Sequence, residues 1–476
     1  MVGVFTPQIS MRRIATMLSI TLLMILSEVL IFGSSEIFDF VHKDYDFVLR
    51  ISKSADWYTE INKVPFFSFA LNRKGLGFED SFIRTLEDMK YRTGIDPEVV
   101  EDALSKDIIF ASKGVEMNVS DLMSFDLNYY FEFIKNIATH TFLAFETKYT
   151  NQLPRALAFL LSVSYKDLGG NTSLLGDSLY CGSVSKYFVV AGSKQALELA
   201  IKTFSTPEMQ LDKSVREFDR LKAGTFWISG YAKPNTLKFK LPGGVNIDDS
   251  DAEYLLFHST VSAGSLNLTV EQKNKKQETT KKITDNIGNL QIAWNYYLAM
   301  PTTNTEAVAN SIKEWLQGFT PDVGRLVDFV GYASKSSSYL YTIGRLESGD
   351  ILFILDNFTG KELESNLSKL GAKYDSQKQE WTMINGNTQL YVYKSSNRLI
   401  IGNVDKSKYD SYEKTRKKLK DLPIYYDFSK IATYDFKLFM DVGDIIKSTT
   451  GFNISSKLLF WSYRSGYFTY YKLLLS

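Results

Sequence analysis

One pattern of apolar and polar positions occurs twice in the chain. Residues 179–193 read LYCGSVSKYFVVAGS, and residues 390–404 read LYVYKSSNRLIIGNV, 211 positions later (390 minus 179). Each stretch predicts two strands joined by a turn, because β-branched and aromatic residues stand between clusters of glycine, serine and asparagine. Further pairs of segments recur in the same order at slowly changing offsets. We therefore predict an internal duplication; the alternative is two unrelated domains with the same rhythm of strands and helices.

The start of each repeated unit is predicted from its aromatic residues and glycines. Residues 63–71 (KVPFFSFAL) and 291–300 (QIAWNYYLAM) are predicted to be opening strands. Helices are predicted at 79–93 and at 305–317, because each stretch ends at a glycine, the residue that best adopts the left-handed conformation after a helix. Each unit would then begin with a strand followed by a helix.

Capping residues and turns predict the elements that follow. Asp96 with the proline after it favours the start of a helix. Strand-to-helix junctions are predicted at Gly192 and Asp405. Alternating apolar residues on both sides of Gly264 and of Gly466 predict meandering hairpin strands that close the two units.

These elements predict an α+β fold. It would consist of two similar units with mostly antiparallel sheets and flanking helices, preceded by one N-terminal apolar helix. The length of 476 residues suits two domains, because a single hydrophobic core rarely keeps growing at that size. The expected divisions are a signal peptide or membrane anchor at 1–35, a first unit at 36–272, a polar linker at 273–288 and a second unit at 289–476.

The N-terminus is typical of an export signal. Arg12 and Arg13 precede an apolar run at 14–32 that contains one charge, Glu28. The full run approaches the roughly 20 residues that span a bilayer, whereas its uncharged part has the length of the apolar region of a signal peptide. Small residues before position 36 suit cleavage after Ser35. A retained anchor and a cleaved signal both remain open.

The position of the arginines predicts where the rest of the chain lies. Basic residues stay on the cytoplasmic side of a membrane segment, so the residues after about 35 are expected outside the cytoplasm, in the periplasm or at the cell surface. If the signal is cleaved, the protein is secreted. Cys181 is the only cysteine, which excludes an intramolecular disulfide and a lipid-modified cysteine after the signal.

Charge and motifs argue against nucleic-acid binding and known catalytic chemistry. The chain has 55 basic and 54 acidic residues, without the basic excess of a duplex-binding protein. His42, His140 and His258 stand far apart, and the chain has no HExxH pair, phosphate-binding glycine loop or GxSxG elbow. We therefore expect no catalytic residues, no cofactor and no bound metal. His258 is expected to serve as a packed or surface aromatic residue.

Three further groups of residues are interpreted as structural. Cys181 lies in a predicted strand and is expected to be a small buried apolar residue. The acidic stretch 246–254 lacks the glycine and terminal glutamate of a calcium-binding EF-hand loop, so a solvated turn is favoured over a calcium site. The aromatic stretch 125–137 is interpreted as core, with an exposed partner-binding or lipid-binding patch as the alternative.

Several segments resemble a known protein family. They are the W..I..VPFFSFAL pattern from Trp57, GIDPEVVEDALSKDIIFAS from Gly94 and YFVVAGSKQALELAI from Tyr187. Between residues 55 and 230 the chain is similar to a family of bacterial exported proteins that is known only as a domain of unknown function. The resemblance implies a location in the cell envelope and a role that is not enzymatic.

The export signal, the repeat and the missing catalytic motifs lead to one functional expectation. We expect an exported or membrane-anchored cell-envelope protein that acts by binding or scaffolding, attached to the membrane through residues 14–32, with a protein or a lipid of the envelope as partner. One alternative is a carrier of a lipid or another apolar ligand, suggested by 28 Tyr and 33 Phe. A second alternative is an uncharacterised enzyme.

Overall fold

The computed structural model describes residues 36–476 apart from several short gaps. The residues outside the description after position 35 are 53–54, 115–116, 119–137, 219–220, 222–225, 235, 239, 242–244, 247–250, 283, 292–293, 304–311, 314–322, 346, 386–387, 415–417 and 423–424. The described chain divides into two compact units. Unit 1 takes its residues from 36–117, 121–237 and 254–268, and unit 2 takes its residues from 118–120, 238–253 and 269–476.

The prediction of two similar units with sheets of their own is wrong, and the apolar helix predicted before them falls on residues that the structure does not describe. In the described residues, 19 strands belong to one hydrogen-bonded antiparallel sheet, accompanied by 11 α-helices, so the chain is α+β overall. Strand β14 (Ser265–Thr279) runs from unit 1 into unit 2. The expected linker at 273–288 therefore begins inside a strand. Of residues 273–279 in this strand, five are exposed and none is buried, so their polar sequence resembles that of a linker.

No apolar helix precedes the sheet in the described residues. None of the helices there is long and apolar enough to cross a membrane. The apolar run at 14–32 lies outside the described residues.

In the described residues, nine strands of the sheet lie wholly or mostly in unit 1, together with several helical segments. Its strands pair in the order β5, β6, β7, β8, β4, β2, β1, β9, β13. The strands are β1 (Phe47–Ile51), β2 (Ile108–Ser112), β4 (Thr141–Glu146), β5 (Tyr165–Gly169), β6 (Thr172–Leu175), β7 (Leu179–Val184), β8 (Tyr187–Ala191), β9 (Ile228–Ala232) and β13 (Ala252–Ser262). The helical segments are η1 (Glu36–Phe40), α2 (Ala55–Ile61), α3 (Pro65–Leu71), α4 (Phe78–Thr93), α5 (Glu98–Leu104), α8 (Leu153–Leu161) and α9 (Lys194–Phe204).

Both faces of the central unit 1 strands β1, β2, β4 and β8 are buried. One face packs against η1 and α9, and the other packs against α4, α5 and α8. Side chains along β8 point alternately to the two faces of the sheet. Val189 belongs to the hydrophobic cluster with η1 and α9, and Phe188 and Val190 belong to the cluster with α4, α5 and α8. Arg50 and Asp107 form a buried ion pair at 2.9 Å in this unit.

Unit 2 repeats the strand order of unit 1. Its strands pair in the order β18, β19, β20, β21, β17, β16, β15, β22, β23. The strands are β15 (Tyr296–Pro301), β16 (Tyr339–Arg345), β17 (Asp350–Asp356), β18 (Lys373–Asp375), β19 (Glu380–Asn385), β20 (Thr388–Ser395), β21 (Arg398–Gly402), β22 (Phe436–Met440) and β23 (Leu458–Leu475). The helices are α12 (Val323–Lys335), α13 (Leu363–Lys369), α14 (Lys406–Glu413), α15 (Tyr425–Lys430) and α16 (Val442–Thr450).

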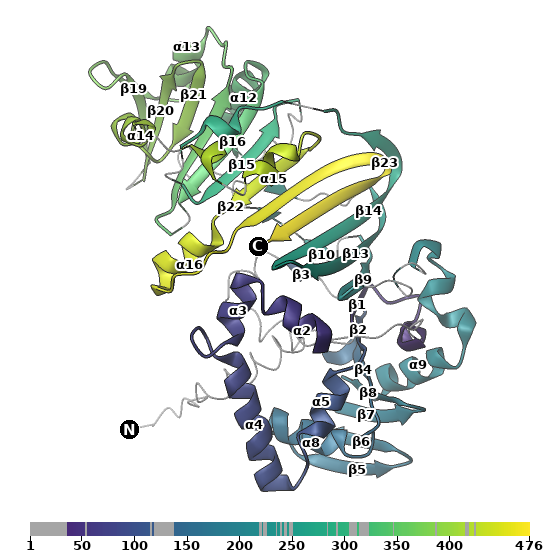
Figure 1. Ribbon diagram of the computed structural model, residues 1–476. Helices are drawn as coiled ribbons and strands as arrows, with labels where there is room; N and C mark the ends of the chain where they lie inside the picture. The colour runs from purple at the N-terminus through teal and green to yellow at the C-terminus, as the bar shows by residue number, and fades with distance from the viewer. Residues whose placement is uncertain are drawn as a thin grey trace, which may run out of the picture. The chain divides into compact units, whose positions relative to one another are not determined.

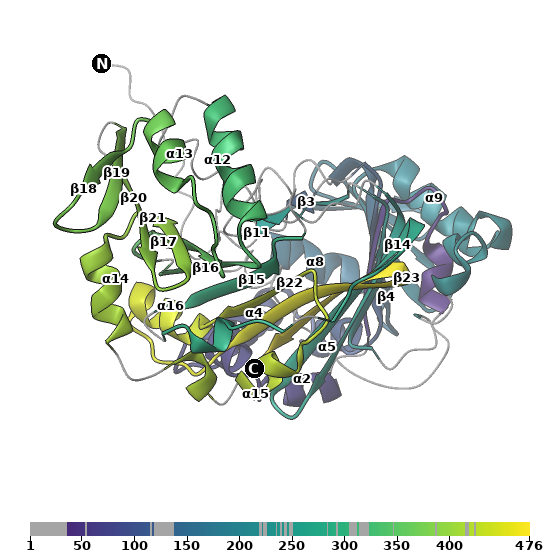
Figure 2. The same cartoon turned by 90° about the horizontal axis from the view of Figure 1, so that it is seen from above.

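The last strand of unit 2 is a hairpin, and two of its helices are neighbours. Strand β23, yellow in Figure 1, doubles back near Gly466, which has a φ of 64°. Lys457 and Ser476 exchange two backbone hydrogen bonds of 2.9 Å, so the ends of β23 are neighbours. Helices α12 and α13 lie side by side (Figure 2).

The repeated sequence pattern folds into matching hairpins. Strands β7 and β8 meet at a turn in which Ser185 has a φ of 54°, and β20 and β21 meet at Ser396 with the same φ. The helix predicted after Gly192 is α9, whose N-cap Ser193 accepts a hydrogen bond from the backbone of Ala196. The junction at Asp405 is confirmed in the same way, because Asp405 caps α14.

Predictions near the start of each unit were less accurate. The helix predicted at 79–93 is α4, with Gly94 left-handed at its C-cap as expected. The strand predicted at 63–71 is wrong, since these residues form helix α3 with Pro65 in its first turn. The strand predicted at 291–300 is shorter and begins at Tyr296. The helix predicted at 305–317 falls almost entirely outside the described residues.

Candidate functional site

Unit 2 contains an open cleft of about 630 Å³. The end of β14 and the residue after it, helix α15, residues 431–433 and both halves of β23 line this cleft. These segments are adjacent because β22 and β23 pair directly, and because Lys282 and Thr433 form an isolated antiparallel bridge.

The floor of the cleft is apolar. Leu459, Trp461 and Leu474 line it and also touch or belong to the main core of unit 2. Side chains alternate across a strand, so Leu459 and Trp461 share one face of β23. The opposite face of β23 at Leu458 and Phe460 is buried elsewhere. Leu459 is buried, whereas Trp461 and Leu474 are partly exposed, so the hydrophobic core reaches solvent at these two side chains.

Arg464 forms one polar wall of the cleft. Its Nε donates to Asp435 at 3.2 Å, and its Nη1 pairs with Glu278. Thr280 Oγ1 donates to the other carboxylate oxygen of Asp435 at 3.0 Å and accepts from the Arg464 backbone at 2.8 Å. Arg464 is thus held in place by two carboxylates and presents a fixed set of N–H donors beside the apolar floor.

Lys430 stands on the other wall, at the end of α15. Its Nζ lies 3.7 Å from the centroid of the Tyr426 ring and 3.9 Å from Asp427. Both contacts are exposed to solvent, where a cation–π contact or an ion pair stabilises the side-chain position by about 1 kcal/mol or less. Lys430 can therefore turn toward a ligand at low cost.

A buried ion pair lies behind the cleft. Lys437 is directly opposite Trp461 in the pairing of β22 with β23. Its Nζ lies 2.7 Å from Asp285, and the ring centroids of Phe428 and Tyr434 are 4.6 and 4.7 Å away. Burial lowers the pKa of Lys437, and the charge of Asp285 opposes this shift.

Two acidic groups near the cleft have unequal surroundings. Burial raises the pKa of Asp435 to about 6, although the hydrogen bond from Thr280 opposes the shift. Asp285 accepts a 2.6 Å hydrogen bond from Tyr434, and burial together with this carboxylate raises the pKa of the tyrosine. The carboxyl of Asp435 therefore takes up a proton at a higher pH than an exposed carboxyl does.

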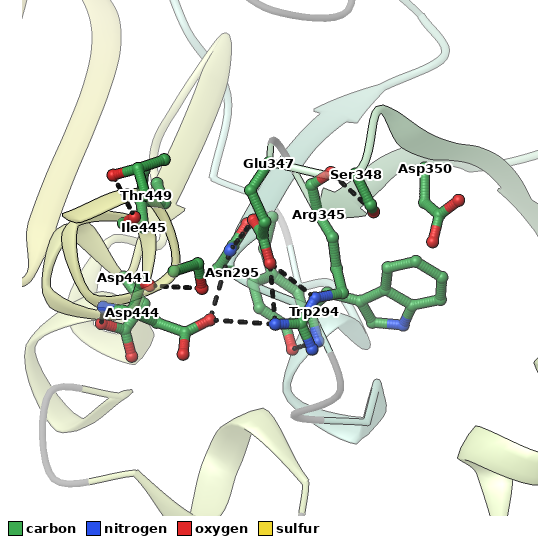
Figure 3. Close-up of polar contacts among 12 residues, drawn as sticks. Trp294, Asn295, Arg345, Glu347, Ser348, Asp350, Asp441, Asp444, Ile445 and Thr449 are labelled. Atoms are coloured by element: carbon green, nitrogen blue, oxygen red, sulfur yellow. Dashed lines mark hydrogen bonds and ion pairs between the residues drawn. The ribbon is translucent and has the colours of Figure 1, made fainter. Parts of the chain in front are cut away.

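A second polar cluster of unit 2 joins β15, β16 and α16 (Figure 3). The buried amide of Asn295 donates to Glu347 at 2.6 Å and to Asp444 at 3.2 Å. Arg345 also reaches both carboxylates, at 2.7 and 3.5 Å. Asp441 caps α16 through a 2.9 Å hydrogen bond from the Asp444 backbone.

The chemistry of this second cluster is structural. Burial alone would raise the pKa of Glu347, but hydrogen bonds from Asn295 and Arg345 outweigh burial and lower it. Every charged group of the cluster is matched by an opposite charge or an amide, so the cluster offers no free acid, base or nucleophile. It fastens the start of α16 to the sheet, and the cleft is the better candidate for a binding site.

The structure shows where most residues discussed from the sequence lie. His42 Nδ1 accepts from the Asp44 backbone at 3.1 Å, and burial lowers the pKa of His42. His140 is exposed at the end of a short 3-10 helix. His258 packs on Phe226 with ring centroids 4.2 Å apart, which confirms its expected aromatic role.

The remaining residues singled out from the sequence form no site in the described residues. Cys181 is buried as expected, and burial raises its pKa to about 12. In the acidic stretch, Asp251 pairs with Lys276 at 2.9 Å, and residues 247–250 lie outside the described residues. The aromatic stretch 125–137 also lies outside them. In the described residues, no group of three or more His, Cys, Asp and Glu could hold a metal ion.

The residues of the cleft were not found from the sequence. Nothing in the sequence marks Trp461, Lys430, Asp435 or Arg464 as functional. No motif joins them, because residues 279–280, 430–435 and 459–474 meet only through strand pairing. The available signal was the charge of Lys437 inside an otherwise apolar strand, FKLFM.

Comparison with known proteins adds little. No protein-family model and no curated protein matches the chain. Crystal forms III and IV of a protein called TP0453 are similar at 13% identity over 38% of this chain and 77% of that chain, with TM-scores of 0.25 and 0.26. Crystal form I gives 14% identity and a TM-score of 0.23. Likenesses of this size support no conclusion about function.

Proposed function

We propose that the chain is an exported cell-envelope protein, held at the membrane by residues 14–32, that binds an amphiphilic ligand in the cleft of unit 2. The observation that carries the proposal is the composition of the cleft, an apolar floor beside fixed cationic donors. The export signal and the resemblance to exported proteins support the location. A cleaved signal would place the same binding protein in solution outside the cytoplasm.

The apolar part of the ligand would cover the partly exposed side chains of Trp461 and Leu474. This contact is favourable because it removes apolar surface from water at about 25 cal/mol per Å². The polar part of the ligand would carry hydrogen-bond acceptors and would face Arg464 and Lys430. Glu278 is half exposed, so an acceptor on the ligand can replace it on Arg464.

The charged groups of the cleft favour binding over catalysis. A catalytic acid or base needs a free side chain that faces the reacting atoms. Arg464 and Asp435 are engaged with each other, and Asp427 is exposed at the rim. We therefore propose a role that is not enzymatic. Protein scaffolding through the same cleft would need a partner that inserts an apolar side chain onto Trp461.

Photocrosslinking tests the ligand site. The full-length chain in membranes would be irradiated with a diazirine-bearing fatty acid, and the labelled peptides would be mapped by mass spectrometry. We expect label on β23 between Leu459 and Arg464. Ala432→Trp should fill the cleft and reduce this label at least about fivefold, equivalent to about 1 kcal/mol. Ser411→Trp, on the exposed side of α14, is the matched control.

Label spread evenly over the chain, or unchanged by Ala432→Trp, would refute the ligand site. The location is tested separately by protease treatment of intact spheroplasts. We expect cleavage in the exposed Lys281–Lys282 region only from outside the cytoplasmic membrane. Protection of this region in spheroplasts, with cleavage after lysis, would refute the proposed location.

A further inference from the structure

The guanidinium of Arg464 has hydrogen-bond donors that the protein does not use. Its Nε donates to Asp435 at 3.2 Å, and its Nη1 pairs with Glu278. In the part of the chain that the structure describes, no protein group accepts a hydrogen bond from Nη2. The two Nη atoms of an arginine can hold both oxygens of a carboxylate or of a phosphate. Arg464 lines the cleft, so it can bind an anionic group there if Glu278 moves away.

The two carboxylates on Arg464 differ in how firmly they are held. Asp435 is only 18% exposed, and its other oxygen accepts a 3.0 Å hydrogen bond from Thr280. Glu278 is 50% exposed and, among the described residues, pairs with Arg464 alone. An exposed ion pair is weak, because water competes for both partners. Asp435 therefore fixes the guanidinium, and Glu278 can leave it at low cost.

Lys430 adds a second cation to the lining of the cleft. Its Nζ lies 3.9 Å from Asp427, and it makes no hydrogen bond to a described residue. Of the residues that line the cleft, Lys430 and Arg464 carry a positive charge and Asp427 carries a negative charge. Asp427 is 52% exposed, so water and salt screen its charge. The lining therefore favours a ligand with a negatively charged group.

The contact between Glu278 and Arg464 also restricts the class of head group. It is a hydrogen bond between two charged groups, and such bonds are roughly twice as strong as bonds between neutral groups. A neutral acceptor that displaces Glu278 would replace a strong bond by a weaker one. A carboxylate or a phosphate would replace it by an equivalent bond and could add a second bond from Nη2.

We propose that the ligand of the cleft is an anionic amphiphile, and that its carboxylate or phosphate head group replaces Glu278 on Arg464. The inference rests on the proposed function and adds the class of the head group. In the free protein Glu278 occupies the position of the anion and lowers the affinity for the ligand. Asp435 and Thr280 hold the guanidinium in place during the exchange.

Three photoreactive probes with the same diazirine-bearing alkyl chain test the head group. They are a fatty acid, an alkyl phosphate and a fatty alcohol, each added to the full-length chain in membranes at pH 8. Glu278→Gln removes the internal competitor, and Arg464→Lys keeps the charge beside Asp435 but removes the paired donors. Glu98→Gln is the matched control, because Glu98 is a glutamate of similar exposure, 56%, that pairs with a lysine.

Glu278→Gln should raise the labelling of β23 by an anionic probe about two- to fivefold, the range expected from the loss of an exposed ion pair. Arg464→Lys should lower this labelling at least about threefold. Labelling by the fatty alcohol should change less than about twofold in either variant, and Glu98→Gln should change none of the three. Each comparison uses one probe on two chains, so it does not depend on how that probe partitions into the membrane.

The outcomes separate the head group from the ligand site itself. A response of the fatty acid or of the alkyl phosphate supports the proposal, and the probe that responds more identifies the head group as a carboxylate or a phosphate. Labelling of β23 that is the same in Glu278→Gln and the wild-type protein, or that changes equally with the alcohol, would overturn the anionic head group and leave the ligand site standing. Absence of β23 labelling by all three probes would refute the proposed function.

Discussion

The buried pair of Lys437 and Asp285 behind the cleft allows a sharp test of the structure. The two side chains are only 4% and 5% exposed, and their charged atoms are 2.7 Å apart. Asp285→Asn keeps the shape of the side chain but removes its charge, which leaves the lysine cation buried without a counter-charge. Breaking a buried pair in this way costs about 3–5 kcal/mol of unfolding free energy.

The loss of unfolding free energy in Asp285→Asn should be smaller at higher pH. Burial already lowers the pKa of Lys437, and Asp285 opposes that shift, so the substitution lowers the pKa further. A lysine whose pKa is depressed in the folded state destabilises the fold at low pH, and stability returns as the pH rises from the folded pKa to the unfolded pKa. The loss in Asp285→Asn should therefore be large at pH 7 and smaller at pH 10.

Urea denaturation of the full-length protein at both pH values measures this effect. Glu98→Gln is the matched control, because Glu98 pairs with Lys148 at 2.7 Å on the exposed surface, and no change in the midpoint is expected. A loss below about 1 kcal/mol for Asp285→Asn, or a loss that is equal at pH 7 and pH 10, would refute the reasoning about the buried pair.

Three further results are expected. Asp435→Asn should remove a fall in stability of up to about 3 kcal/mol between pH 4 and 6, because the raised pKa of about 6 stabilises the fold only at lower pH. If the midpoint of urea denaturation falls across that range as much in the variant as in the wild-type protein, the prediction is wrong. Gly230→Ala should lower the free energy of unfolding by at least about 1–3 kcal/mol, since its Cβ would lie 2.1 Å from the Val48 carbonyl oxygen. Gly331→Ala in α12 has open space around its Cβ and should not destabilise the protein. Calorimetry that finds Gly331→Ala the less stable variant would contradict the packing. The Cys181 thiol should react with a thiol reagent at pH 8 only after unfolding, so fast reaction of the native protein would show that the strand is open.

Local signals predicted several elements well. Ser193 and Asp405 cap their helices as expected, and the hairpins around Ser185 and Ser396 follow from a turn between two apolar runs. These features depend on a few neighbouring residues, so the sequence contains enough information to predict them. The strand predicted at 63–71 failed for the opposite reason. An apolar run without clear alternation fits a helix as well as a strand, and tertiary packing decides between them.

The single sheet and the cleft could not be predicted from local patterns. Polar residues at 273–279 suggested a linker, but backbone hydrogen bonds to neighbouring strands hold them in β14. Lys437 and Asp285 are 152 positions apart (437 minus 285), and nothing in their spacing indicates that they meet. Long-range pairing creates both the sheet and the site, and one sequence carries no direct signal of it.

The central claim is that the cleft of unit 2 binds an amphiphile in the cell envelope. Native mass spectrometry of the full-length protein, extracted from membranes in a mild detergent, tests it most directly. We expect the wild-type protein and Ser411→Trp to carry a small molecule with an apolar part, and Ala432→Trp to lack it. An empty wild-type protein, or a ligand that remains bound in Ala432→Trp, would contradict the claim.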